Sequence, residues 1–183
     1  KELNILDDNS EIKALETINE NAQYLSNTID DFRDVFKKSK TKNIVNVNNL
    51  FEKTLKLILT RLKNKEIKII NNCSNIEIET YASEMIQVIM NIINNAIDAF
   101  DNKDYNKFLF LEAYEFENKI IIKIKDNAGG IEENILDRIF EPYFTTKESA
   151  QGTGIGLYMC NEIIVKHLNG KIFATNESFE YEG

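Results

Sequence analysis

Apolar residues recur along this chain with two different periods. From residue 1 to about residue 40 they follow steps of three and four, the spacing of a helix that packs along a narrow seam against other helices. The seam residues are Leu15, Ile18, Ala22, Leu25, Ile29, Phe32 and Phe36. One helix cannot bury this seam by itself, so we expect a helical hairpin or a dimeric bundle whose other helix comes from outside the segment or from a second copy. The alternative is a helix that folds back on the domain that follows.

After this segment the pattern alternates between helices and strands. The basic, polar stretch Lys37–Asn43 lacks apolar periodicity and is expected to be a linker at a domain boundary. Helices are predicted over about 49–63, over 84–100 and after residue 156, where the last one stops before Asn169-Gly170. Strands are predicted at Ile67–Ile70, Ile76–Thr80, Phe108–Phe116, Lys119–Lys125 and Lys171–Thr175.

The third and fourth predicted strands are separated only by Glu117-Asn118 and should form a β-hairpin. This order of elements predicts an α+β fold, a two-layer α/β sandwich with a mixed sheet, preceded by a long N-terminal helix of a helical bundle. We expect the first domain to cover residues 1–40 and the second residues 41–183, with the closing strand of the sheet incomplete.

Two glycine-rich clusters hold five of the chain's seven glycines. They are DNAGGI (Asp126–Ile131) and GTGIGL (Gly152–Leu157), and they flank FEPYFTTK (Phe140–Lys147). The second cluster runs into a predicted helix, whose first N–H groups and dipole favour a phosphate. The alternative is that the glycines only form two turns. Because no GxxxxGK[ST] motif occurs and GTGIGL follows a polar run, a nucleotide site here is neither a P-loop nor a Rossmann turn.

The helix predicted over 84–100 is apolar nearly all round except for one polar ridge. Steps of three and four place its residues on one side: Glu84, Gln87, Asn91, Asn95 and Asp98. Burying these groups unpaired would cost ~1 to 3 kcal/mol each, so the ridge faces water, a partner or a ligand. Carboxamide and carboxylate oxygens suit Mg²⁺. Together with the glycine clusters, the ridge favours one site for a triphosphate and Mg²⁺; the alternative is a solvated helix edge.

Composition restricts the possible partners. The formal net charge of -8 argues against non-specific nucleic-acid binding. No long apolar run is present, so we expect no membrane contact by this fragment and no signal peptide. Cys73 and Cys160 lack a paired spacing and are expected to be small buried residues in a reducing compartment. The expected location is cytoplasmic, and an inner-membrane anchor elsewhere in the full-length protein stays open.

Four motifs in this order resemble those of the ATP-binding catalytic domain of sensor histidine kinases, in the fold shared with gyrase, Hsp90 and MutL. QVIMNIINNAIDA resembles the N box, DNAGGI the first glycine box, FEPYFTTK the F box, and GTGIGL the second glycine box. The resemblance covers about residues 46–183. In addition, the heptad helix resembles the second helix of the family's dimerisation and histidine-phosphotransfer hairpin.

The resemblance implies a site for ATP and Mg²⁺. Asn95 would coordinate the metal, Asn91 would lie beside the phosphates, and Lys147 would reach toward them. Asp126 would accept a hydrogen bond from the adenine amino group, and the segment from about 132 to 151, anchored by Phe140, would be a mobile lid. The other residues expected at the nucleotide are Asp98, Ala128, Gly130, Ile131, Tyr143, Gly152, Thr153, Gly154, Ile155, Gly156 and Leu157.

The chain departs from the family pattern at two places. Ala128 stands where the first glycine box has its first glycine, which is a mild change unless that position needs a positive φ. The family phosphorylates a histidine on the first helix of the hairpin, whereas the one histidine here is His167. A cation near a helix C-terminus explains His167. The resemblance therefore implies a kinase whose acceptor histidine is missing from this fragment, which by itself should not autophosphorylate.

Relatives that hydrolyse ATP carry a glutamate one turn before the Mg²⁺ asparagine. Here that position is Asn91, an amide that cannot take up a proton at neutral pH. This favours slow or negligible ATP hydrolysis and transfer of the γ-phosphate to a histidine, then to an aspartate of a response regulator, by a homodimer formed through the N-terminal helix. The alternatives are a conformational ATPase or protein serine kinase of the same fold, and a non-catalytic nucleotide-binding module.

Overall fold

The computed structural model describes residues 41–101, 103–147, 154–178 and 180. The predicted dimerisation helix over 1–40 lies outside the described residues. So do Gly152 and Thr153 of the second glycine cluster.

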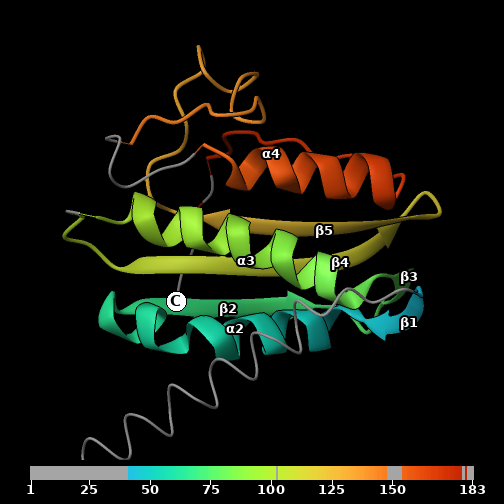
Figure 1. Ribbon diagram of the computed structural model, residues 1–183. Helices are drawn as coiled ribbons and strands as arrows, with labels where there is room; N and C mark the ends of the chain where they lie inside the picture. Colours follow the sequence, from blue (N-terminus) through green and yellow to red (C-terminus); the bar gives the residue numbers. More distant parts are fainter. Residues whose placement is uncertain (1–40, 102, 148–153, 179, 181–183) are drawn as a thin grey trace, which may run out of the picture. The chain divides into compact units, whose positions relative to one another are not determined.

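The chain from residue 41 onward is built on a mixed sheet with helices on one face. The strand order is β2 (Ile67–Cys73), β4 (Lys107–Phe116), β5 (Lys119–Asp126), with β2 parallel and β5 antiparallel to β4. The helices α2 (Val47–Asn64) and α3 (Ala82–Ala99) pack on this sheet, and α3 lies between α2 and α4 (Figure 1). The α+β architecture with a mixed sheet is therefore confirmed.

The core lies between the sheet and the helices. On β4 the alternate residues Leu109, Leu111 and Ala113 are fully buried, as expected for the helix-facing side of a central strand. On α3 the buried residues include Ile89, Ile93 and Ile97, which lie four apart on one face. Burial of each such side chain contributes about 1.5 to 3 kcal/mol relative to exposure, so this layer holds the polar ridge of α3 in place.

A short strand that the sequence pattern did not predict precedes α2. This strand, β1 (Asn43–Asn46), pairs antiparallel with β3 (Glu77–Thr80), so Asn43 is part of a sheet and not of a linker. Four residues are too few to show a period. The same segment starts α2 at Val47, two residues before the prediction, because the Asn46 side chain accepts from the N–H groups of Asn48 at 2.9 Å and Asn49 at 3.4 Å.

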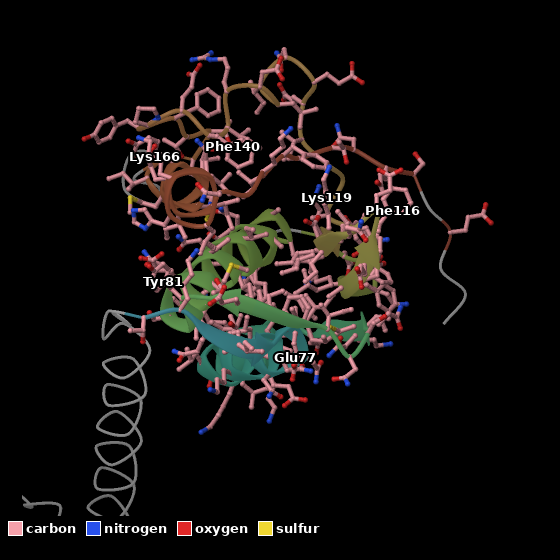
Figure 2. All side chains as sticks on the ribbon, turned by 90° about the vertical axis from the view of Figure 1, so that its right-hand side faces the viewer. Glu77, Tyr81, Phe116, Lys119, Phe140 and Lys166 are labelled. Carbon is pink, nitrogen blue, oxygen red and sulfur yellow. The ribbon has the colours of Figure 1, made fainter. Side chains whose placement is uncertain are left out.

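The predicted β-hairpin is confirmed. Glu117 and Asn118 have φ values of 49° and 58°, so both central turn residues are left-handed, as in a type I′ turn that matches strand twist. Phe116 and Lys119 face each other across the turn, and Figure 2 shows them at the same end of the sheet. The hairpin fixes the register of β5 and so the place where that strand ends, at Asp126.

The helix after the second glycine cluster consists of two parts. The α-helix α4 (Gly156–Asn161) continues as the π-helix η1 (Glu162–His167). It ends as predicted: Asn169 has a φ of 53°, and the N–H of Gly170 donates to the Ile164 carbonyl at 2.8 Å. Cys160 and Ile163 pack against Val88 of α3.

The predicted strand Lys171–Thr175 is wrong, because these residues form no strand with any part of the chain that the structure describes. Side-chain contacts hold the segment instead. Ile172 packs on the cluster of Val88, Cys160 and Ile163. The Asn176 side chain makes hydrogen bonds to both the N–H and the carbonyl of Ile131. The alternation of apolar and polar residues is real, but Phe173 is 77% exposed and no backbone ladder forms.

No helix within the described ranges is long and apolar enough to span a lipid bilayer.

Replacing the cap of α2 should destabilise the fold. Asn46→Ala removes the side-chain acceptor for two N–H groups and is expected to lower the free energy of unfolding by about 1 kcal/mol, the usual effect of losing an N-cap. Urea unfolding would measure it. Asn49→Ala in the first turn is the matched control, since its side chain has no capping role, and an equal loss for both variants would contradict the assignment.

Candidate functional site

The polar ridge of α3 faces other elements along its length. Its five residues are half-buried. At one end a carboxylate oxygen of Glu84 lies 3.1 Å from His167 Nδ1, within hydrogen-bonding distance. In the middle the Asn91 amide donates to the Gly156 carbonyl at 3.3 Å, and at the other end Asp98 pairs with Lys147. A solvated helix edge does not describe this ridge, because Glu84 and Asn91 contact the helix that follows the second glycine cluster and Asp98 pairs with Lys147 of the F-box segment.

Lys147 brings a positive charge to the ridge. Its Nζ lies 2.6 Å from Asp98 Oδ2 and 3.5 Å from Asn95 Oδ1. Asn95 and Lys147 belong to motifs far apart in sequence, and their meeting was expected only from the resemblance. The carboxamides of Asn91 and Asn95, the carboxylate of Asp98 and the Lys147 ammonium thus form one polar cluster.

The second glycine cluster approaches the F-box segment closely. Gly154 has a φ of 64°, and a Cβ there would lie 2.4 Å from the Tyr143 carbonyl carbon, so only glycine fits. Tyr143 contributes its backbone to this contact, while its side chain is 76% exposed and is not brought into the cluster. Among the described residues no side chain caps α4 at Ile155, so within this part of the chain its first N–H groups could donate to an anion.

Gly156 and Leu157 form the first turn of α4. A Cβ on Gly156 would lie 3.9 Å from Asn91 Cγ, an ordinary contact, so this glycine is not required for the ligand-free fold. Leu157 is half-buried and Ile155 is exposed. Directly before the F-box segment Ile139 is buried, whereas Phe140, the first residue of that segment, is only half-buried. Ile139 is therefore the more deeply anchored residue, which the motif did not indicate.

The first glycine cluster carries a half-buried carboxylate. Asp126 ends β5 and accepts from the Ala128 N–H at 2.9 Å. Burial raises the pKa of Asp126, and the hydrogen bond from Ala128 opposes part of that shift. Gly129 and Gly130 have φ values of 107° and 78°, while Ala128 does not have a positive φ. Alanine in place of glycine is therefore accommodated at residue 128.

Two asparagines hold this cluster, and neither was predicted. Asn176 Oδ1 accepts from the Ile131 N–H at 2.9 Å and its Nδ2 donates to the Ile131 carbonyl at 2.6 Å. It also fills the space where a Cβ on Gly130 would lie, 2.6 Å from Asn176 Oδ1. Asn127 Oδ1 accepts from the Phe108 N–H at 2.8 Å. In a chain rich in asparagine, no local pattern distinguishes these two residues.

The two cysteines differ in their surroundings. Cys160 is the buried residue of α4 and packs against Val88 of α3. Burial raises the pKa of its thiol to about 11, so it stays neutral at neutral pH. Cys73 is half-buried at the end of β2, which is less than expected. Both are free thiols.

The cluster suits a partly hydrated cation better than a closed metal site. Within the described residues no group of three His, Cys, Asp or Glu side chains could enclose a metal ion. Mg²⁺ keeps several waters and is usually bound by one or two protein oxygens together with phosphates. The oxygen of Asn95, one helical turn from the Asn91 side chain that contacts Gly156, fits that pattern, so the donors present are compatible with Mg²⁺ bound to a triphosphate.

Similarity to known proteins identifies the family. Residues 80–182 match the family model described as histidine kinase-, DNA gyrase B-, and HSP90-like ATPase. The chain belongs to this family.

The relatives of this ATPase-family chain include sensor histidine kinases. Sensor histidine kinase ZraS of Escherichia coli (strain K12) is 32% identical over 125 residues, which are 67% of this chain and 26% of that protein. The C4-dicarboxylate transport sensor protein DctB of Pseudomonas aeruginosa is 26% identical over 130 residues, 70% of this chain and 21% of that protein. The chain thus spans about a quarter of the length of these relatives.

Solved structures agree with this assignment. The catalytic domain of histidine kinase ThkA, in a nucleotide-free form, has a TM-score of 0.66 and 27% identity, with 75% of this chain and 88% of that one covered. ThkA in complex with the response regulator protein TrrA has a TM-score of 0.62 and 21% identity over 94% of this chain and 49% of that one, a likeness of fold. The mixed sheet and its helices are those of a histidine kinase catalytic domain, and the relatives point to a phosphotransferase.

Neutralising the half-buried carboxylate of Asp126 should stabilise the ligand-free domain. A carboxyl group whose pKa is raised on folding adds stability only when protonated, below its unfolded pKa near 3.8, and this stability is lost as the pH rises through the folded pKa. At neutral pH Asp126→Asn should therefore raise the free energy of unfolding, by an amount of the order of 1 kcal/mol. The gain should shrink as the pH falls toward the unfolded pKa.

Urea unfolding at neutral and acidic pH would measure this difference. Asp101→Asn is the control with the opposite sign, because the hydrogen bond from Lys65 lowers the pKa of Asp101 and its neutralisation should destabilise the domain at neutral pH. A loss of stability on Asp126→Asn at neutral pH would show that burial is not the main influence on the pKa of Asp126, and that the hydrogen bond from Ala128 outweighs it.

Proposed function

We propose that this chain is the ATP-binding catalytic region of a sensor histidine kinase, which binds Mg-ATP and transfers the γ-phosphate to a histidine on a dimerisation hairpin. The observation that carries the proposal is the meeting of the α3 ridge with Lys147 and with the start of α4. Asn95, Lys147 and Gly156 come from three separate motifs. A single ligand explains why they meet. A magnesium triphosphate needs a positively charged side chain, an oxygen that can bind the metal, and backbone N–H groups.

Asp126 would recognise the base. A carboxylate has several acceptor positions, and the Ala128 N–H uses one of them, so acceptor capacity remains for the amino group of adenine. Partial burial of this carboxylate lowers the local dielectric and strengthens such a hydrogen bond. Gly130 and Ile131, held by Asn176, and Ala128 beside them would line the adenine pocket.

The phosphates would lie between the ridge and the first turn of α4. Lys147 would donate to a terminal phosphate oxygen, Asn91 would lie beside the chain of phosphates, and the N–H groups near Gly154, Ile155 and Gly156 would add further donors. Asn95 would be the protein ligand of Mg²⁺, which when bound offsets the negative charge of the triphosphate. Leu157 would pack near the base, and Gly152 and Thr153 would complete the second glycine cluster.

Transfer is favoured over hydrolysis because the ridge position one turn before Asn95 holds an amide and not a carboxylate. Phosphoryl transfer depends mainly on positioning and charge neutralisation, which this cluster can supply. Asn91 occupies the ridge position one turn before Asn95 and contacts Gly156, and its amide cannot activate water. This weakens the alternatives of a conformational ATPase and of a serine kinase that would hydrolyse ATP readily.

The acceptor histidine would come from outside these residues. His167 is paired with Glu84, whereas Lys147 is paired with Asp98. Glu84 and Asp98 lie roughly 20 Å apart along α3 at 1.5 Å per residue, so His167 lies at the wrong end of the ridge. A homodimer formed through the helix predicted over 1–40 would present the acceptor in the cytoplasm, and a response regulator would then receive the phosphoryl group.

Nucleotide binding can be tested by thermal unfolding. Mg-ATP at a hundred times its Kd should stabilise the chain by ~2.7 kcal/mol. Asn95→Ala should remove most of this effect by removing the metal ligand. Asn94→Ala is the matched control, because the Asn94 side chain bonds to Arg61 of α2 and not to the candidate site. Unchanged ATP affinity in Asp126→Asn would favour a binding module that uses no adenine contact.

Phosphotransfer can be tested on the full-length protein with γ-labelled ATP. We expect label on a histidine outside the 183 residues, lost on treatment with acid, and no label on the 183-residue chain alone. The chain alone should hydrolyse ATP slowly or not at all, because Asn91 cannot act as a base. Brisk hydrolysis by the chain, or label on a serine, would support one of the alternative activities.

A further inference from the structure

One carboxylate on the ridge is shared between two cations from different elements. Asp98 Oδ1 accepts from Arg61 Nη2 of α2 at 2.8 Å, and Asp98 Oδ2 accepts from Lys147 Nζ at 2.6 Å. Arg61 belongs to α2, which packs beside α3, whereas Lys147 ends the F-box segment, so Asp98 joins two separate parts of the chain. Arg61 holds one oxygen, which leaves the other directed at Lys147.

This pairing places the Lys147 ammonium beside the proposed metal ligand. Its Nζ lies 3.5 Å from Asn95 Oδ1 and donates a hydrogen bond to the negatively charged Asp98 carboxylate. The Asp98 carboxylate takes up one N–H of the ammonium and offsets its charge, so Lys147 attracts a phosphate less strongly while that contact persists. A second cation at Asn95 would also repel the ammonium. Asp98 and a terminal phosphate therefore compete for the charge of Lys147.

We propose that Asp98 is a positioning residue that competes with the terminal phosphate for Lys147. This inference rests on the proposed function and adds a residue to it. In the ligand-free domain Asp98 retains Lys147 next to Asn95, and the γ-phosphate must displace that contact. The competition affects only ligands that use Lys147, so it acts on ATP and not on ADP.

The expected size follows from the exposure of the pair. Both side chains are 32% exposed, and ion pairs of this kind contribute modestly in water. Releasing Lys147 by Asp98→Asn should therefore strengthen Mg-ATP binding about twofold to fivefold and leave Mg-ADP binding unchanged. A residue with only a structural role would change both affinities together.

The test is titration calorimetry of the 183-residue chain with Mg-ATP and with Mg-ADP. Asp98→Asn should raise the ratio of ATP to ADP affinity, and in a Lys147→Gln background Asp98→Asn should no longer change this ratio. If the ratio still rises in that background, Asp98 acts by direct repulsion of the phosphates and the proposal is overturned. An unchanged ratio in the single variant overturns it as well.

Asp101→Asn is the matched control. Asp101 follows α3 and pairs with Lys65, the C-cap residue of α2, so its variant removes an ion pair beside the same two helices. The pKa of Asp101 is lowered chiefly by the hydrogen bond from Lys65 and to a smaller extent by the charge of Lys147. Asp101→Asn should therefore change the ratio of affinities much less than Asp98→Asn does. A rise in Asp101→Asn equal to that in Asp98→Asn would show a general charge effect and refute the proposal.

A second readout needs no nucleotide. Trypsin cleavage after Lys147 in the ligand-free chain should become severalfold faster in Asp98→Asn, relative to cleavage after Lys119 in the same sample, and should not change in Asp101→Asn. An unchanged relative rate would contradict the contact. If the wild-type chain bound neither nucleotide, the proposed function would fail, and faster cleavage would still show that Asp98 retains Lys147.

Discussion

The structure depends on a polar ridge that is held half-buried in an otherwise apolar helix. The buried isoleucines of α3 fix the helix against the sheet, and this fixes the direction of the ridge. Polar groups in such a position need partners, and the chain supplies them from distant segments: His167 at one end, Gly156 in the middle and Lys147 at the other end. The requirement to satisfy these groups draws the second glycine cluster and the F-box segment to the same face.

Much of this arrangement follows from sequence periodicity. The steps of three and four that place Asn91, Asn95 and Asp98 together are a property of the helix alone, and the hairpin around Glu117-Asn118 follows from two strand patterns and a two-residue gap. Strand β1 could not be predicted, because its pairing with β3 is long-range and its four residues show no period. The prediction of a strand at Lys171–Thr175 failed for a different reason. Apolar and polar residues do alternate there, but the segment is held by side-chain contacts and not by backbone hydrogen bonds to a neighbouring strand.

The residues of the candidate site that belong to a sequence motif could be predicted. The single side chains outside the motifs that hold those residues in position could not. Asp126, Lys147 and Gly154 lie in recognisable clusters. Asn176 and Arg61 do not, although Asn176 holds both backbone groups of Ile131 and Arg61 holds one oxygen of Asp98. Such supporting residues depend on contacts between elements, which no local pattern records. The deviation at Ala128 is harmless for a local reason, its ordinary backbone conformation, which only coordinates reveal.

The π-helical ending of the helix after Gly156 has a consequence for anyone who aligns this family. In η1 the hydrogen bonds span five residues, as between Leu168 and Ile163, so each turn takes up more of the chain than in α4. Helical-wheel projections that treat residues 156–168 as uniform will misassign the outward and inward faces increasingly toward the C-terminal end. A one-residue gap opposite Glu162–His167 in a homologue would then be a change of helix type with the termination signal preserved, and not the loss of a structural element.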